Sequence, residues 1–210
     1  MIKILAVTIV SLAIGVVLAL RLIDLPVRVG YLGFALMIAA AWAARTRWAH
    51  RARVADEPGA RERLAWHALA STAVVVGHLI GILIQPNFDM HGTVGHALAV
   101  DNWMLIAGAV VSYFVLHDPK NERDERDAAI AARASSFGYA TLVCLLIAVL
   151  LSLGFAPRQW LAPFTHQLLA HVLIVVIALA SLAQCAAQLF GYWQDYLPAS
   201  RQDDNFVSKR

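Results

Sequence analysis

The stretch from His117 to Tyr139 reads HDPKNERDERDAAIAARASSFGY and separates two long apolar runs. Its first seventeen residues contain five acidic and four basic side chains, whereas the segments on either side are almost wholly apolar. Charged side chains are costly in hydrocarbon and stable in water. We therefore interpret this stretch as a water-facing connection between two membrane-spanning helices, and its charges indicate which side of the membrane it faces.

The composition excludes an ordinary soluble domain. Of the 210 residues, 60% are hydrophobic and 15% are charged, and the mean hydropathy is +0.65. Soluble domains average roughly 45–50% apolar and about 25% charged residues. The net charge is only +3, and the Lys and Arg residues lie in the connections between apolar runs instead of forming one basic stripe. We therefore do not expect the protein to bind nucleic acid.

Six apolar runs are long enough to cross the membrane as helices, which takes about 20 residues for ~30 Å of hydrocarbon. They cover approximately residues 4–20, 27–44, 64–84, 98–116, 136–156 and 164–192. The sequence thus predicts an all-α polytopic membrane protein. We expect one six-helix transmembrane domain over residues 1–197 and a disordered cytoplasmic tail over residues 198–210. Because no A-x-A cleavage site precedes Arg21, we expect the first span to be retained.

The distribution of basic residues predicts that both termini are cytoplasmic. With that orientation, all 17 Lys and Arg residues except Arg21, Arg28 and Arg158 fall on the cytoplasmic side. This asymmetry is the one that membrane proteins show. The six tryptophans fall near the expected span boundaries and not at mid-span, which agrees with the preference of amphipathic rings for the headgroup level.

The charged stretch also carries signals for a helix start. We expect Asn121 to cap a helix whose first turns are rich in acidic residues, because negative charge is favourable at the positive end of the helix dipole. Ile130 and Phe137 follow at helical spacing, so the helix is expected to run on into the fifth span. Arg126 and Arg133 can pair either with the nearby acidic side chains or with lipid phosphates.

The residues from about 122 to 193 resemble a known family. A four-residue acidic and basic motif precedes an apolar span, and a last helix of the type HQLLAHVLIVVIALASLAQCAAQLFGYW follows. The motif residues are Asp124, Glu125, Arg126 and Asp127. This pattern resembles a family of small uncharacterised prokaryotic membrane proteins that carry a DERD motif. The resemblance implies a protein of the bacterial or archaeal inner membrane and implies no catalytic residue.

Polar side chains within the expected spans are the best pointers to function, because a polar group in hydrocarbon needs a partner. His78 lies between Gly77 and Gly81, whose spacing lets another helix, from this chain or from a second copy, approach closely. The last span carries polar residues at alternating spacings of four and three, which places them on one helical face. These residues are Gln167, His171, Ser181, Cys185, Gln188 and Tyr192.

The expected outer surface combines histidines and aspartates. The connection QPNFDMHGTVGHALAVD contains no Lys or Arg, and a further histidine begins the last span. The residues concerned are Asp89, His91, His96, Asp101 and His166. Imidazole and carboxylate groups suit zinc or copper, so a metal site is one interpretation of this group. Hydrogen bonds that only join helices are another interpretation.

Paired histidines at two depths allow a haem interpretation as well. His78 and His171 lie at a similar depth toward the outer side, whereas His67 and His117 lie near the inner boundary. Two b-type haems held by such pairs would carry an electron across the bilayer. The cofactor is thus left open by the sequence, with none favoured and with a metal ion or haem b as the two candidates.

The sequence contains no recognised catalytic signature. We find no G-x-S-x-G, no HExxH, no glycine-rich phosphate loop and no pair of carboxylates within a span. We therefore favour a non-enzymatic inner-membrane protein, either a small transporter or an accessory or sensor subunit, whose outer His and Asp residues face the solute or partner. The alternative is a transmembrane haem-b electron carrier. Expected partners are the lipid bilayer, a second copy of the chain, or a cytoplasmic or membrane protein.

Overall fold

The computed structural model describes residues 1–20, 27–51, 59–85, 93–117, 124–161 and 165–207. All regular secondary structure in these ranges is helical. The helices are α1 (Ile2–Ala19), α2 (Val29–Arg51), α3 (Ala60–Leu83), α4 (Thr93–Leu116), α5 (Glu125–Phe155), α6 (Arg158–Leu161) and α7 (His166–Val207). All of them except the short α6 are long and apolar enough to cross a membrane. This confirms the predicted all-α fold with six candidate spans.

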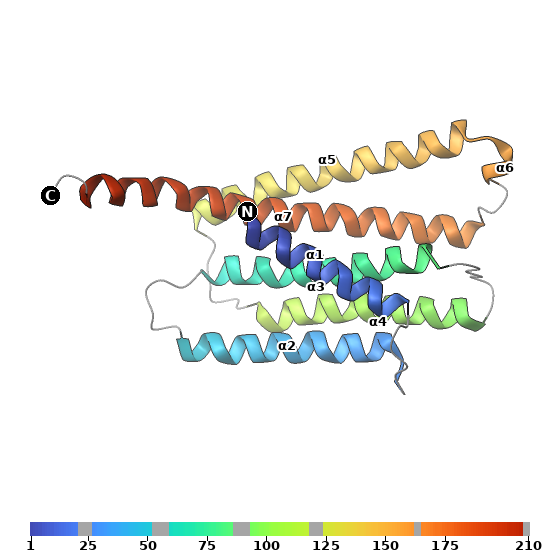
Figure 1. Cartoon of the computed structure of the whole chain (residues 1–210), viewed down its shortest axis with the longest axis horizontal. Coiled ribbons are helices and arrows are strands. Elements are labelled where there is room, and N and C mark those ends of the chain that lie inside the picture. The colour runs from blue at the N-terminus through green and yellow to red at the C-terminus, as the bar shows by residue number, and fades with distance from the viewer. Residues whose placement is uncertain (21–26, 52–58, 86–92, 118–123, 162–164, 208–210) are drawn as a thin grey trace.

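The long helices form a bundle in which α1 crosses the others obliquely (Figure 1). Toward one end of the bundle, α1, α3 and α5 begin, whereas α2, α4 and α7 end. We call this the terminal end and the opposite one the distal end. The successive spans thus alternate in direction, as a chain that crosses a membrane repeatedly must do.

Helix α3 lies at the centre of the bundle. The largest helix contacts are those of α1 with α3, α2 with α4, and α5 with α7, and α3 also contacts both α4 and α7. Of the candidate span in α3, 56% is buried, compared with 6% of the span in α5. Helix α5 is therefore a peripheral helix that packs mainly on α7.

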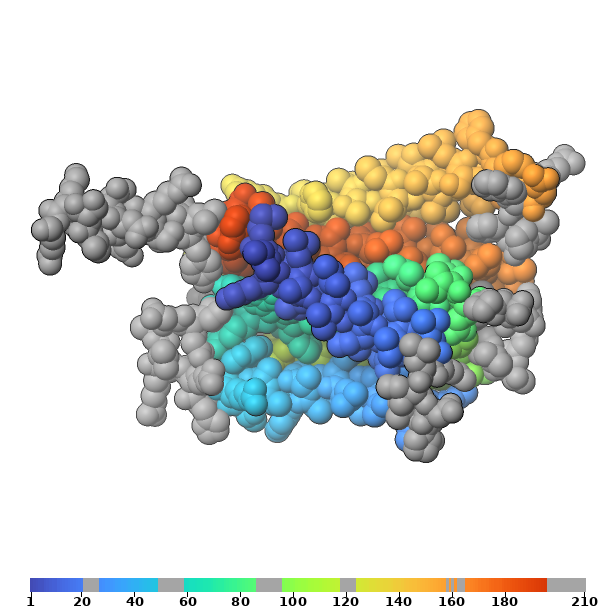
Figure 2. Space-filling view, in the orientation of Figure 1, coloured from blue at the N-terminus to red at the C-terminus, as the bar shows by residue number. Residues whose placement is uncertain are grey.

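Small residues bring α1 and α3 into close contact. A Cβ atom on Gly15 would overlap the carbonyl oxygen of Val74, and one on Gly77 would overlap the carbonyl oxygen of Leu12. Gly81 also faces α1. Close backbone approach of this kind increases van der Waals contact between helices where lipid supplies no hydrophobic driving force. Figure 2 shows α1 (blue) crossing the face of the bundle that is turned to the viewer, in front of α3.

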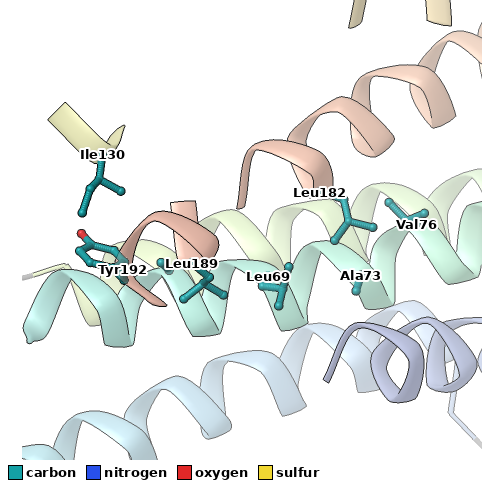
Figure 3. Close-up of a cluster of buried hydrophobic side chains, with 8 residues drawn as sticks. Leu69, Ala73, Val76, Ile130, Leu182, Leu189 and Tyr192 are labelled. Atoms are coloured by element: carbon teal, nitrogen blue, oxygen red, sulfur yellow. The ribbon is translucent and has the colours of Figure 1, made fainter. Parts of the chain in front are cut away.

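A cluster of buried apolar side chains joins α3, α5 and α7 (Figure 3). Its labelled members are Leu69, Ala73, Val76, Ile130, Leu182, Leu189 and Tyr192. Ile130 is the contribution of α5, and it occupies the space in front of Gly191, where a Cβ atom would lie 2.8 Å from Ile130 Cγ2. Through this cluster, the first turns of α5 pack against α7.

The start of α5 differs from the prediction in its capping residue. The cap is Asp124, whose Oδ1 accepts a hydrogen bond of 2.7 Å from the backbone N–H of Asp127. The extended backbone of Asp124 directs its carboxylate over this first-turn N–H, as a capping residue requires. Asn121, the predicted cap, lies outside the described residues. Arg126 Nε pairs with Asp195 of α7 at 2.8 Å.

Helices α5 and α7 extend furthest beyond the expected spans. As predicted, α5 runs without interruption from the charged motif into the fifth span and ends at Phe155. Helix α7 continues to Val207, across most of the tail that we expected to be disordered, and residues 208–210 lie outside the described residues. Pro198 lacks a backbone N–H and so removes one helical hydrogen bond, yet the described helix continues on both sides of it.

Candidate functional site

A polar cavity of about 200 Å³ lies at the terminal end of the bundle, where α3, α5 and α7 meet beside one side chain of α4. Leu64 and three alanines supply its apolar lining. Its polar lining consists of Arg61, Tyr113, Asp127, Gln184, Cys185, Gln188 and Tyr192. The fold thus brings the charged motif and the polar face of the last helix, which are far apart in the sequence, into one cavity.

A hydrogen bond joins two walls of this cavity. The hydroxyl of Tyr192 on α7 donates to Asp127 Oδ1 on α5 at 3.0 Å, and Figure 3 shows the hydroxyl directed toward the helix that carries Ile130. Tyr192 is buried, and a buried tyrosine hydroxyl usually finds such a partner. Asp127 lies in the first turn of α5, where its negative charge also meets the positive end of the helix.

The lining supplies both signs of charge and both kinds of hydrogen-bonding group. Arg61 comes from the first turn of α3, whereas Asp127 comes from α5. The carboxamides of Gln184 and Gln188 each provide donors and acceptors. Gly138 of α5 lets α7 approach at this level, because a Cβ atom there would lie 2.8 Å from Gln184 Cβ. The cavity can therefore bind a small polar solute through several directed hydrogen bonds.

Three of the polar lining residues were not identified from the sequence. Gln184 lies four residues before Gln188 on the same helix, so an extension of the four-residue spacing would have found it. Arg61 and Tyr113 carry no comparable local signal. Their position at the cavity results from the packing of α3 and α4 against α7, which the sequence alone does not specify.

The predicted polar face of the last helix is divided between different environments. Cys185 and Gln188 line the cavity. Ser181 is exposed, and its hydroxyl donates to a backbone carbonyl of its own helix at 3.0 Å. His171 is buried against α3, and Gln167 is partly buried near the distal end. Only the terminal half of the predicted face belongs to the candidate site.

The histidines and aspartates of the predicted metal site are not gathered by the described structure. Asp101 lies within α4 and is 1% exposed, whereas His96 and His166 are exposed in the first turns of α4 and α7. Asp89 and His91 lie outside the described residues. Among the residues that are described, no group of three or more His, Cys, Asp or Glu side chains could hold a metal ion. The metal site stays a prediction.

Asp101 instead joins two helices. Its Oδ1 accepts a hydrogen bond of 3.2 Å from the backbone N–H of Gly30, in the first turn of α2. First-turn N–H groups have no partner within their own helix. A Cβ atom on Gly30 would overlap the backbone of Asp101, so glycine permits this close approach. The carboxylate of Asp101 on α4 thus supplies a hydrogen-bond acceptor for the first turn of α2.

The two histidines of the predicted outer haem level are both buried. His78 lies on α3 and His171 on α7, and these helices pack together. His171 Nε2 lies 3.0 Å from the carbonyl oxygen of Leu79, the residue after His78. Iron ligation through this nitrogen would require that contact to be replaced. The outer haem level stays a prediction.

The histidines of the inner level also have neighbours. His67 Nε2 lies 2.8 Å from Ser112 Oγ, and this hydroxyl donates to the carbonyl oxygen of Ala109. The Nε2–H of His67 is therefore the donor in a bond between α3 and α4. The ring of His117 stacks on that of Tyr113, with centroids 6.0 Å apart. A haem at this level would have to displace the bond between His67 and Ser112.

Comparisons of the chain with family models, with curated proteins and with solved structures found no match. The resemblance of residues 122–193 to the DERD family stays a prediction. The polar cavity is therefore interpreted from its own geometry and chemistry.

Proposed function

We propose that the protein is a non-enzymatic transporter of a small polar solute and that the polar cavity is the solute site. The observation that carries this proposal is the presence of Arg61 and Asp127 on different helices around a cavity of about 200 Å³. Hydrogen bonds that only hold helices together need no open volume. A polar cavity of this size instead has room for water or a small solute.

The lining supports a particular class of solute. The volume is several times the ~30 Å³ that one molecule occupies in liquid water, so a molecule of a few heavy atoms fits. One cation, one anion and two carboxamides favour a solute that offers both donors and acceptors, such as a zwitterion, a small amide or a polyol. The small apolar residues of the lining leave little contact area for a large apolar ligand.

The proposed setting is the inner membrane of a prokaryote, with the terminal end of the bundle in the cytoplasm. The excess of Lys and Arg in the segments at that end supports this orientation. The cavity is then an inward-facing site. A sensor or accessory subunit would use the same cavity to bind the solute without moving it across the membrane.

Binding tests the proposal most directly. Detergent-purified protein is screened for thermal stabilisation by a panel of amino acids, small amides and polyols, and the stabilising solutes are then used in uptake assays with proteoliposomes. Replacement of Gln188 by Leu removes hydrogen bonds to the solute, so we expect about tenfold weaker binding, or more. Gln159→Leu is the matched control, because Gln159 is exposed on α6 and remote from the cavity.

The outcomes separate the alternatives. Binding and uptake that Gln188→Leu reduces and Gln159→Leu leaves unchanged support the transporter. Binding without uptake would assign the cavity to a sensor subunit. If no solute of the panel stabilises the protein or is taken up, the proposal is wrong.

A further inference from the structure

A second and larger cavity opens on the surface between α1, α5 and α7, toward the terminal end of the bundle. Its volume is about 740 Å³, and we call it the crevice. Most of its walls are apolar, with Ile4 and Leu5 from α1, Phe137 from α5, and Phe190 and Ala187 from α7. Figure 2 shows the first turns of α1 (dark blue) beside the red part of α7 and the yellow start of α5 at this level.

Two arginines contribute to the lining of the crevice. Arg126 and Arg133 both line it, seven residues apart on α5. This spacing is about two helical turns, or roughly 10 Å along the helix axis. Arg126 is neutralised by its salt bridge with Asp195, whereas Arg133 is exposed and adds a positive charge. Asp127 does not line the crevice, and its carboxylate accepts a hydrogen bond from Tyr192 in the polar cavity.

The position of Arg133 corresponds to the headgroup level of a membrane. Tyr139 follows six residues later on α5 and is 70% exposed, and exposed aromatic rings are typical of the boundary between headgroups and hydrocarbon. Toward the distal end from Arg133, the crevice is lined by apolar side chains. A guanidinium group above an apolar slot matches a phospholipid, whose phosphate lies above its acyl chains. Arginine can also bind phosphate through two parallel hydrogen bonds.

We propose that the crevice binds one anionic phospholipid, with the lipid phosphate on Arg133 and one acyl chain between α1, α5 and α7. The volume lies within the roughly 300–1,000 Å³ of ordinary ligand pockets. An anionic headgroup is favoured over a choline headgroup, because choline would bring a second cation beside Arg133. This lipid site is separate from the polar cavity, so it does not depend on the identity of the solute.

Native mass spectrometry of the purified protein tests this proposal. The protein is exchanged into a mixture of phosphatidylglycerol and phosphatidylcholine that have the same acyl chains. We expect one tightly retained phosphatidylglycerol, preferred over phosphatidylcholine by about fivefold or more. Arg133→Gln should abolish that preference, and Arg133→Lys should retain part of it. Ala187→Phe, which fills the crevice, should reduce retention of both lipids.

Arg47→Gln is the matched control, because Arg47 is exposed on α2 and the substitution removes the same charge away from the crevice. Equal retention of both lipids by the wild type, or an unchanged preference in Arg133→Gln, would overturn the proposal. A dimer that Ala187→Phe dissociates, in the absence of retained lipid, would assign the crevice to a second copy. If Ala187→Phe does not fold, the exposed Arg133 variants still decide the outcome.

Discussion

Gly15 of α1 faces the backbone of α3 at Val74 and His78, and Gly77 of α3 faces the backbone of α1 at Leu12. At both positions a side chain would occupy space that the backbone of the other helix already fills. Dispersion contacts are individually weak and depend steeply on distance. The packing of α1 on α3 therefore depends on two residues that have no side chain.

Replacement of Gly15 by Ala should destabilise the protein. The new Cβ atom would overlap the carbonyl oxygen of Val74, and separation of the helices should cost about 1–3 kcal/mol of unfolding free energy. This loss is expected although alanine favours a helix by roughly 1 kcal/mol over glycine. The midpoint of thermal unfolding in detergent measures the change.

Gly154→Ala on α5 is the control, because a Cβ atom at that position would meet no other part of the described chain within 4 Å. Its unfolding midpoint should stay the same or rise. If the two alanine variants behave alike, the close approach of α1 and α3 does not contribute to stability.

The sequence predicted only the α3 side of the contact between α1 and α3. The spacing of Gly77 and Gly81 indicated that some helix comes close, but it did not identify which one. The matching residues of α1 are buried at the same four-residue spacing, and they are Ser11, Gly15 and Ala19. They were not singled out because small residues are common in membrane helices, and only the packing of α1 on α3 distinguishes these three.

At the scale of helices, α2 depends on α4 for the hydrogen bonding of its first turn. Replacement of Asp101 by Leu removes the acceptor of the Gly30 N–H. A buried donor without a partner costs about 1–3 kcal/mol, so we expect a loss of this size in the unfolding free energy. Asp101→Asn keeps a side-chain oxygen and should lose less than half as much. Chemical denaturation in detergent measures both.

An equal loss in the two Asp101 variants would show that the negative charge, and not the acceptor, stabilises α2.

The position of Asp101 illustrates what could not be predicted from the sequence. The fourth span was expected to begin near residue 98, but α4 begins at Thr93. Apolar runs predict the part of a helix that crosses hydrocarbon. Polar first turns, such as that of α4, carry no hydropathy signal, and the burial of Asp101 depends on Gly30, which is 71 residues away.

At the scale of the whole molecule, the alternation of the six spans fixes which connections share a side. Reporters inserted within residues 52–58 and 118–123 and after Arg210 should be active in the cytoplasm, and one within residues 86–92 should be active on the opposite side. The excess of basic residues at the terminal end is the physical reason. Paired fusions to a cytoplasm-active and a periplasm-active enzyme provide the measurement and its control at each position.

If the reporter after Arg210 is active only on the periplasmic side, the orientation is reversed and the polar cavity lies on the outer face.

The sequence predicted the membrane class and the number of candidate spans, because hydropathy is a property of each segment. It did not predict the cavity. Asp127 and Tyr192 were each recognised as polar residues of separate segments, and their hydrogen bond exists only because α5 returns along α7.

The order in which the helices pair has a consequence for biogenesis. Helix α1 packs mainly on α3, and α2 packs mainly on α4, so neither of the first two spans makes its main contact with its immediate neighbour in the chain. During synthesis, α1 and α2 therefore remain in the translocon or in lipid without these main contacts until the third and fourth spans have been inserted. A nascent chain released after Arg51 would therefore leave the small-residue face of α1, formed by Ser11, Gly15 and Ala19, uncovered.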